Sequence, residues 1–133
     1  MNQLLTDESE MTYRQIHPTF IKDGVPSSSR FIPSAKDQNK LSVDRGSLVS
    51  AEESHANYVA SGLKSAAVFG LTVGEFKSVD IPTFADPIAE TPDRPENLAH
   101  ALADYSAHSA AEQKQKALRL QEMAIQRGPL HTE

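Results

Sequence analysis

The sequence predicts a small α+β domain with short antiparallel strands, one central helix and a C-terminal helix. Three observations lead to this class. Short segments between residues 13 and 45 alternate between apolar and polar residues, as strands with one buried face do. Two later segments open with S-x-x-E and space their apolar residues with a helical period. At 133 residues, the chain has room for one modest core and a single domain.

Residues 1–11 are polar and acidic, and we expect them to form a disordered tail. The segment YRQIHPTF, residues 13–20, alternates loosely until Pro18 interrupts it. After a turn-rich stretch, SRFIP (residues 29–33) and LSVDR (residues 41–45) are two further strand candidates.

The central helix is predicted over about residues 50–62. Ser50 and Glu53 match a capping box, in which each side chain satisfies an amide of the first turn. One helical face carries Ala51, His55, Tyr58, Val59 and Gly62. The next stretch, SAAVFGLTVGEF (residues 65–76), is the most apolar in the chain and predicts a buried strand with a bulge or turn at its glycines.

Residues 77–97 are rich in proline and acidic residues, which predicts an extended, solvent-exposed connector. Residues 98–108 fit an amphipathic helix or an edge strand equally well, because alanine carries little periodic signal. The α+β domain therefore spans residues 12–108, with the connector inside it.

The C-terminal helix is predicted over about residues 109–126, within a segment extending to residue 127. It opens with Ser109 and Glu112, a second S-x-x-E pair, and ends at Gly128. Its narrow apolar stripe consists of Ala117, Leu120 and Ala124. Residues 128–133 are expected to form a tail.

Composition excludes several classes of function. The net charge of −5 and the pI of about 5.5 disfavour binding to nucleic acid or an anionic membrane, since both require a basic face. The absence of cysteine excludes disulfides, thiol catalysis and Cys-based zinc sites. No apolar run approaches the roughly 18 residues of a membrane helix, and the N-terminus lacks the features of a signal peptide. We therefore expect a cytoplasmic protein.

The polar segment from Arg14 to Arg45 is the main candidate site. His17 is a candidate general base or acid, and Ser42 a candidate nucleophile. Glu75, at the end of the most apolar stretch, is a third catalytic candidate. The candidate ligand-binding residues, chosen for anion binding and hydrogen bonding, are Ser29, Arg30, Lys36, Asp37 and Arg45. Turn-rich scaffold has the same composition, so a purely structural interpretation stays open.

The five histidines show no spacing typical of a metal site. His55 lies within the predicted central helix, and His100 and His108 are eight residues apart. We therefore predict neither a metal nor a cofactor.

Several short motifs follow one another along residues 13–101. They are HP, SSRFIP, KD, LSVDR, an S-x-E-E helix start, LTVGE and PENLAHA. Their order resembles that in a family of short bacterial proteins for which no activity is established. The resemblance implies a small bacterial domain in which these polar positions recur: His17, Ser29, Lys36, Asp37 and Ser42. It implies neither a mechanism nor a substrate.

Two classes of function follow, beside a purely structural role as a subunit of a larger assembly whose tails become ordered on contact. The first is a small bacterial protein that binds a partner protein, as an accessory, immunity or antitoxin-like subunit of a defence system. Its acidic charge suits a basic partner, because opposite charges speed association, and the C-terminal helix is a candidate for self-association. The alternative is a small enzyme or ligand-binding domain that acts on a nucleotide or phosphorylated ligand through residues 17–45. The sequence leaves open whether the chain is an enzyme, because it contains no motif with a fixed mechanism.

Overall fold

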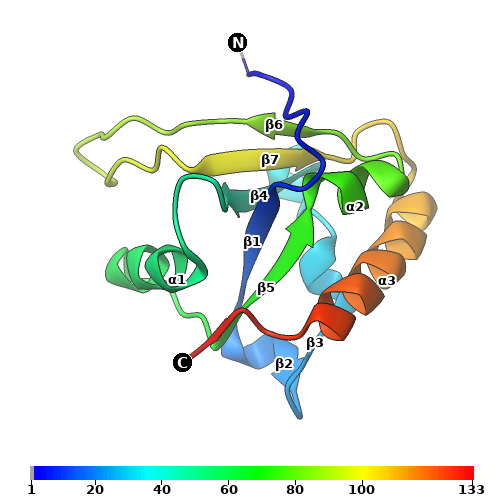
Figure 1. The fold of residues 1–133 in the computed structure, drawn as a ribbon, viewed down its shortest axis with the longest axis horizontal. Coiled ribbons are helices and arrows are strands. Elements are labelled where there is room, and N and C mark those ends of the chain that lie inside the picture. Colours follow the sequence, from blue (N-terminus) through cyan, green and yellow to red (C-terminus); the bar gives the residue numbers. More distant parts are fainter. Residues whose placement is uncertain (1) are drawn as a thin grey trace.

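The computed structural model describes residues 2–133, and its architecture is the predicted α+β class (Figure 1). The strands are β1 (Met11–Ile16), β2 (Ile21–Lys22), β3 (Val25–Pro26), β4 (Lys40–Arg45), β5 (Ala67–Thr72), β6 (Thr83–Ala85), β7 (His100–Asp104) and β8 (His131–Thr132). The helices are α1 (Ala51–Ala60), α2 (Val73–Ser78) and α3 (Ala110–Arg127), with 3₁₀ turns η1 (Pro18–Phe20), η2 (Ser28–Phe31) and η3 (Ala35–Asp37).

Six strands form one antiparallel sheet in the order β6-β7-β4-β1-β5-β8. The β7 strand resolves the alternative left open for residues 98–108. Its Ala101 and Ala103 are fully buried on the core face, and it pairs with β4 along five residues, from Lys40↔Asp104 to Asp44↔His100. A strand is favoured here because β4 supplies a partner for its backbone.

The two faces of the sheet are covered by different helices, with α1 and α3 on opposite sides in Figure 1. Helix α3 packs its predicted stripe on the core face: Ala117, Leu120 and Ala124 are all fully buried. On the other face, α1 contacts β1 and β5, and the His55 ring hydrogen-bonds the Ser65 carbonyl at 2.9 Å. Only part of that face is covered by α1.

Both predicted helices begin where their sequence signals place them. The Ser50 and Ser109 side chains accept hydrogen bonds from the N3 amides, and the N3 glutamates complete both capping boxes. A third capping box joins Thr72 and Glu75, and it starts α2. The predicted strand over residues 65–76 therefore ends at Thr72, and its second half is helical because that box satisfies the first-turn amides.

The predicted strand over residues 29–33 is wrong, because this segment forms the 3₁₀ turn η2. The Ser27 side chain accepts a hydrogen bond from the Ser29 amide, which satisfies the backbone locally and favours a turn over a strand ladder. The turn buries Phe31 completely, and the Tyr105 hydroxyl donates to its carbonyl.

The two ends of the chain differ from the expected tails. The Leu5 amide donates to the Thr83 carbonyl at 2.9 Å, and Leu5 is buried. Residues 3–5 therefore run along the outer edge of β6, and the carbonyls of Glu8 and Glu10 accept hydrogen bonds from the first two amides of α2. Residue 1 of the expected tail lies outside the described residues. At the other end, β8 pairs with β5 through Val68↔His131. Backbone hydrogen bonds to open sheet edges hold both segments in place, and the burial of Leu5 adds to this at the N-terminal end.

The expected connector folds back on itself. Bridges Ile88↔Asn97 and Thr91↔Arg94 join its two limbs, and we call residues 86–99 the hairpin arm. The arm continues the β6 and β7 strands beyond the sheet, as the long loop at the left of Figure 1 shows. It forms a wall beside the part of the sheet that α1 leaves uncovered.

Candidate functional site

A cleft of about 670 Å³ lies between the uncovered sheet face, helix α1 and the hairpin arm. This volume is in the range of small-molecule sites. The sheet contributes Tyr13, Arg14, Gln15, Ser42, Val43, Asp44 and His100; the α1 side Asn57, Tyr58, Ala60, Ser61 and Leu63; and the arm Ile88, Arg94, Pro95, Glu96 and Asn97.

Strand register explains why polar side chains meet at the sheet wall. Tyr13 is the partner of Asp44, and Asp44 is the partner of His100, so the three lie in one row on the same face. Ser42 is two residues from Asp44 and shares its face. The opposite face of β4 carries the buried Leu41 and Val43. The alternation of LSVDR therefore separates core from cleft.

A chain of hydrogen bonds ties the three walls together through Asp44. Ser54 of α1 donates to Asp44 Oδ2 at 2.7 Å, and Asn97 of the arm donates to Oδ1 at 2.9 Å. Behind Ser54, Gln15 Nε2 donates to the Ser54 hydroxyl at 2.8 Å, and the Ser65 hydroxyl donates to Gln15 Oε1 at 2.7 Å. The Asp44 carboxylate thereby sets the position of α1 and of the arm relative to the sheet.

A second chain links Ser42, His100 and Asp86 at one end of the cleft. The Ser42 hydroxyl lies 3.1 Å from His100 Nε2, and His100 Nδ1 lies 3.0 Å from Asp86 Oδ2 and 3.1 Å from the Asp86 carbonyl. Ser42 is exposed, whereas only 14 % of the His100 side chain is exposed. The histidine is therefore held in place, and the serine hydroxyl is open to the cleft.

These partners fix the roles of the two ring nitrogens in neutral His100. A carboxylate and a carbonyl oxygen only accept hydrogen bonds, so Nδ1 carries the proton that faces Asp86. Nε2 is then an acceptor and receives the Ser42 hydroxyl. This arrangement of an acid, an imidazole and a hydroxyl can abstract the serine proton.

Arg14 holds the backbone of Ser42 from the core side. Strands β1 and β4 pair only through Thr12↔Arg45 and Tyr13↔Asp44. Beyond these pairs, Arg14 Nη1 donates to the Ser42 carbonyl at 3.0 Å, and its Nε donates to the Arg30 carbonyl at 2.8 Å. Burial lowers the pKa of Arg14 to about 10, and the Arg30 charge acts in the same direction. Arg14 is therefore still a cation at neutral pH. Its hydrogen bond to the Ser42 carbonyl links β1 to β4 where the two strands no longer pair through their backbones.

Of the predicted catalytic residues, the structure places Ser42 with His100 and gives His17 a different partner set. The His17 Nδ1 atom accepts a hydrogen bond from the Thr19 amide and caps η1. Its ring stands edge-on to Phe20, with 6.2 Å between the ring centroids. The Arg30 guanidinium lies over the same Phe20 ring at 5.0 Å. His17 and Arg30 thus flank Phe20, and neither lines the cleft.

Three of the other predicted ligand-binding residues, Ser29, Asp37 and Arg45, have side-chain partners outside the cleft. The Ser29 hydroxyl lies 2.8 Å from that of Ser27, and Asp37 accepts a hydrogen bond from Ser34 beside Lys36 in η3. Arg45 makes two hydrogen bonds to the Glu10 carboxylate. None of the five predicted ligand-binding residues (Ser29, Arg30, Lys36, Asp37 and Arg45) lines the cleft.

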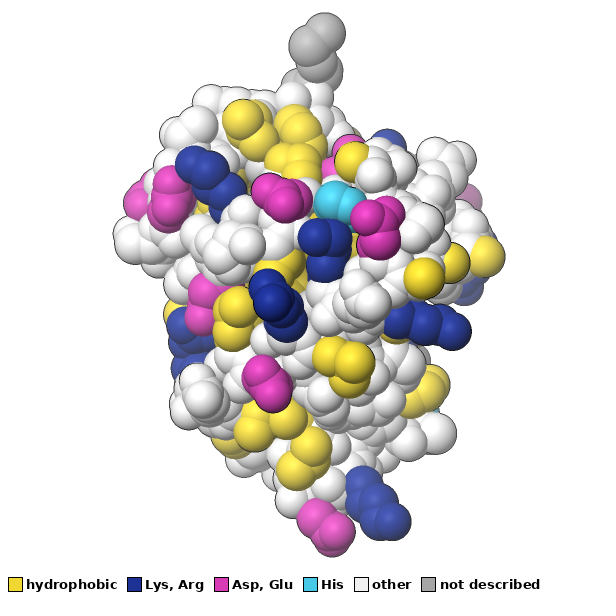
Figure 2. All heavy atoms as spheres, turned by 90° about the vertical axis from the view of Figure 1, so that its right-hand side faces the viewer, with side chains coloured by type: hydrophobic (Ala, Val, Ile, Leu, Met, Phe, Trp, Pro, Cys, Tyr) yellow, Lys and Arg dark blue, Asp and Glu magenta, His cyan; other side chains and the backbone are white. Residues whose placement is uncertain are grey.

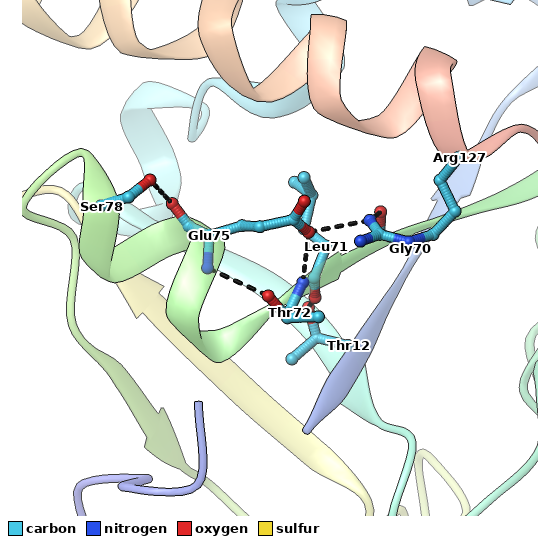
Figure 3. A network of polar contacts seen from close by, with 7 residues as sticks. All are labelled: Thr12, Gly70, Leu71, Thr72, Glu75, Ser78 and Arg127. Carbon is cyan, nitrogen blue, oxygen red and sulfur yellow. Dashed lines mark hydrogen bonds and ion pairs between the residues drawn. The ribbon is translucent and has the colours of Figure 1, made fainter. Parts of the chain in front are cut away.

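Glu75 caps a helix and joins two elements (Figure 3). Its Oε1 accepts hydrogen bonds from the Thr72 amide and from Arg127 Nη1, both at 2.8 Å, and Arg127 also donates to the Gly70 carbonyl. Burial raises the pKa of Glu75, but the hydrogen bonds from Arg127 and Thr72 outweigh it and leave the pKa below its ordinary value. Glu75 is thus an ionised carboxylate that fixes the end of α3.

Sequence reasoning missed His100, Asp86, Asp44 and Asn97 as site residues. A usable signal is present for two of them: Asp44 in LSVDR and His100 in HALAD occupy alternating positions that share a face once β4 and β7 pair. The pairing itself joins distant parts of the chain. Asp86 and Asn97 depend on the hairpin arm, whose closure no local motif marks.

A second cavity of about 330 Å³ lies under the N-terminal segment, between Leu4, Leu5 and the start of β6. It is mostly apolar, and the buried Thr83 hydroxyl beside it has no hydrogen-bond partner among residues 2–133. Two of its charged wall residues, Glu8 and Lys77, are paired with each other at 2.9 Å. The larger cleft offers more open polar groups.

The side of the molecule that carries α3 has a mixed surface (Figure 2). Lys and Arg side chains are interspersed with Asp and Glu, and apolar side chains form separate groups. Leu118 and Ile125 of α3 are exposed, so self-association through this helix stays a prediction. Within the described part of the chain, no helix is long and apolar enough to cross a membrane, and no three His, Asp or Glu side chains are grouped to hold a metal ion.

Comparison of the chain with protein-family models, curated proteins and solved structures finds no match. The resemblance to short bacterial proteins therefore stays a prediction, and the cleft is the feature of the molecule that bears on function.

Proposed function

We propose that this protein binds a small organic ligand in the cleft between the sheet, α1 and the hairpin arm. The observation that carries the proposal is the Asp44 network, because it holds three separate walls around a space of ligand size. Such preorganisation reduces the ordering cost of binding.

The lining indicates the kind of ligand. Tyr58, Leu63 and Ile88 give the cleft an apolar side, and 51 % of Leu63 is exposed. The exposed Ser42 hydroxyl and the Arg94 side chain are polar groups that a ligand can reach. A molecule with one apolar end and one hydrogen-bonding end fits this pattern. The phosphorylated ligand inferred from residues 17–45 has less support, since only Ser42 of the candidate residues in that segment lines the cleft.

Fragment screening by NMR tests the proposal. In ¹H–¹⁵N spectra of the labelled protein, fragments that carry an apolar ring and one polar group should shift the amide signals of cleft residues. Asn57→Trp should abolish these shifts, because Asn57 is exposed, lines the cleft and makes no hydrogen bond through its side chain among residues 2–133. Ala56→Trp is the matched control, since Ala56 is exposed on the same helix but does not line the cleft.

Shifts that survive Asn57→Trp, or a screen in which no fragment perturbs the cleft, would overturn the proposal. Folding of both variants is checked by their thermal unfolding midpoints. Both substitutions add the same bulk to adjacent exposed positions of α1, so a difference between them reports on the cleft.

The hairpin arm favours a second candidate, the binding of a basic partner protein. Glu90, Asp93 and Glu96 are all exposed on the arm, with Arg94 as the one cation on the same stretch. Acidic surfaces of this kind steer basic partners in a salt-dependent way. Association with a candidate partner should weaken on Glu90→Lys with Asp93→Lys, and binding that is unaffected by these changes and by salt would argue against this role.

A further inference from the structure

We infer that Ser42 is a nucleophile activated by His100, and that the cleft hydrolyses small carboxylic esters. This inference rests on the proposed ligand site, and it assigns that site a reaction. The observation behind it is the continuous chain from the Asp86 carboxylate through both ring nitrogens of His100 to an exposed hydroxyl, with distances of 3.0 Å and 3.1 Å.

The chain differs from an ordinary buried hydrogen-bond network in where it ends. The Asp44 network closes on itself, because both carboxylate oxygens are occupied by donors from α1 and the arm. The Ser42 chain ends in an exposed hydroxyl whose oxygen faces a ligand-sized space. A nucleophile needs this combination of a fixed base and an open oxygen.

The neighbouring elements restrict how Ser42 and His100 move. Ser42 is held in β4, between β7 on one side and the Arg14 guanidinium on the other. His100 is held by two acceptors of Asp86, its side-chain and its backbone oxygen. His100 therefore stays within hydrogen-bond distance of the Ser42 hydroxyl. Because the proton of the neutral ring is on Nδ1, Nε2 is free to accept the serine proton.

The step can be written with its atoms balanced. The Ser42 hydroxyl proton passes to His100 Nε2 as the oxygen bonds to the ester carbonyl carbon. The tetrahedral intermediate collapses, the acyl C–O bond breaks, and the imidazolium proton goes to the departing oxygen to give the alcohol. Water then attacks the acyl group by the same route, releasing the acid and restoring Ser42. Asn57 and Arg94 line the same cleft, and their side chains carry N–H groups of the kind that stabilises an oxyanion.

The cleft also indicates the substrate class. The acyl group or the alcohol group can pack against Leu63, Ile88 and Tyr58. The cleft lining carries two carboxylates, Asp44 and Glu96, and two guanidinium groups, Arg14 and Arg94, so it has no excess charge that would select a multiply charged substrate. Neutral esters of modest size are therefore the predicted substrates.

The test uses p-nitrophenyl acetate with the full chain. We expect release of p-nitrophenolate and an acetyl group on Ser42, located by peptide mass spectrometry. Ser42→Ala should abolish both. Because Ser42 is exposed, this variant should fold like the wild type. His100→Gln should slow acetylation about 100-fold, at the low end of general-base effects. His17→Gln is the control, because His17 caps η1 and lies outside the cleft.

Asp86 is a positioning residue, and its test is spectroscopic. In ¹⁵N-labelled protein, the imidazole signals should show the Nδ1–H tautomer of His100, and Asp86→Asn should shift them toward the Nε2–H form. Acetylation confined to lysines, or equal rates in the wild type and Ser42→Ala, would overturn the inference while leaving fragment binding intact. Ser42 acetylation without fragment binding in the cleft would instead overturn the ligand-site proposal.

Discussion

The buried Glu10–Arg45 pair gives the sharpest test of what holds the N-terminal segment to the sheet. Arg45 Nε and Nη2 donate to the two Glu10 oxygens at 2.9 Å and 3.1 Å, and the Ser47 hydroxyl donates at 2.6 Å. Only 5 % of the Glu10 side chain is exposed, against 23 % for Arg45. Glu10→Gln keeps the shape but replaces one acceptor oxygen with an amide NH₂ that faces donors.

The size of the effect follows from these contacts. Hydrogen bonds to charged groups contribute about 1.5–3 kcal/mol each, and breaking a fully buried pair costs about 3–5 kcal/mol. Because Arg45 retains some access to water, we expect Glu10→Gln to lower the free energy of unfolding by about 2–3 kcal/mol. Urea denaturation followed by circular dichroism measures it.

A matched pair at the surface provides the control. Glu8 and Lys77 are also 2.9 Å apart, but 60 % and 69 % of their side chains are exposed. Glu8→Gln should therefore change the free energy of unfolding by less than about 0.5 kcal/mol. Equal effects of the two substitutions would refute the argument from burial.

The same pair predicts a pH dependence. Burial raises the pKa of Glu10, but the hydrogen bonds from Arg45 and Ser47 outweigh it and hold the pKa below the ordinary value of 4.5. The unfolded chain therefore takes up the proton at a higher pH than the folded chain does. The stability difference between the wild type and Glu10→Gln should be constant above about pH 4.5 and shrink as the pH falls through the folded pKa. A difference that grows in acid would contradict this sign.

Two further predictions concern packing. Leu120→Ala should lower the free energy of unfolding by about 2–4 kcal/mol, because Leu120 is fully buried under the sheet. Leu118 lies on the same helix but is 55 % exposed, so Leu118→Ala should lower it by less than about 1 kcal/mol. Urea denaturation measures both changes. Gly46→Ala should destabilise the protein by more than about 1 kcal/mol, because an added Cβ would lie 2.8 Å from the Met11 carbonyl oxygen, and an unchanged thermal midpoint would show that this backbone contact relaxes freely.

Local sequence signals predicted two of the three α-helices of the described residues, α1 and α3. The S-x-x-E pairs at Ser50 and Ser109 act within one helical turn, so neighbouring residues alone decide them. Thr72 and Glu75 form a T-x-x-E pair of the same kind at the start of α2. This helix was not predicted, because the apolar residues around the pair favour a buried strand. The strand predicted over residues 29–33 failed because Ser27 and Pro33 favour a turn that tertiary packing of Phe31 then stabilises.

The site was less accessible to sequence reasoning, because it depends on contacts between distant segments. Ser42 was identified as a candidate nucleophile from its residue type, but its base was sought within the same segment, at His17. The structure brings His100 to Ser42 through pairing of β4 with β7 and brings Asp86 through closure of the hairpin arm. Neither event leaves a local pattern in a single sequence.

The two ends of the chain also protect the sheet from other molecules. The Leu5 amide donates to the Thr83 carbonyl and the Ala85 amide donates to the Gln3 carbonyl, so the N-terminal segment covers the outer edge of β6. The two-residue β8 pairs with Ala67 and Val68 and covers the start of β5. An open edge strand is a template for intermolecular pairing and aggregation. Removal of either end, or a bulky affinity tag fused directly to it, should therefore reduce solubility before it alters the cleft, so tags for expression belong on a flexible spacer beyond both segments.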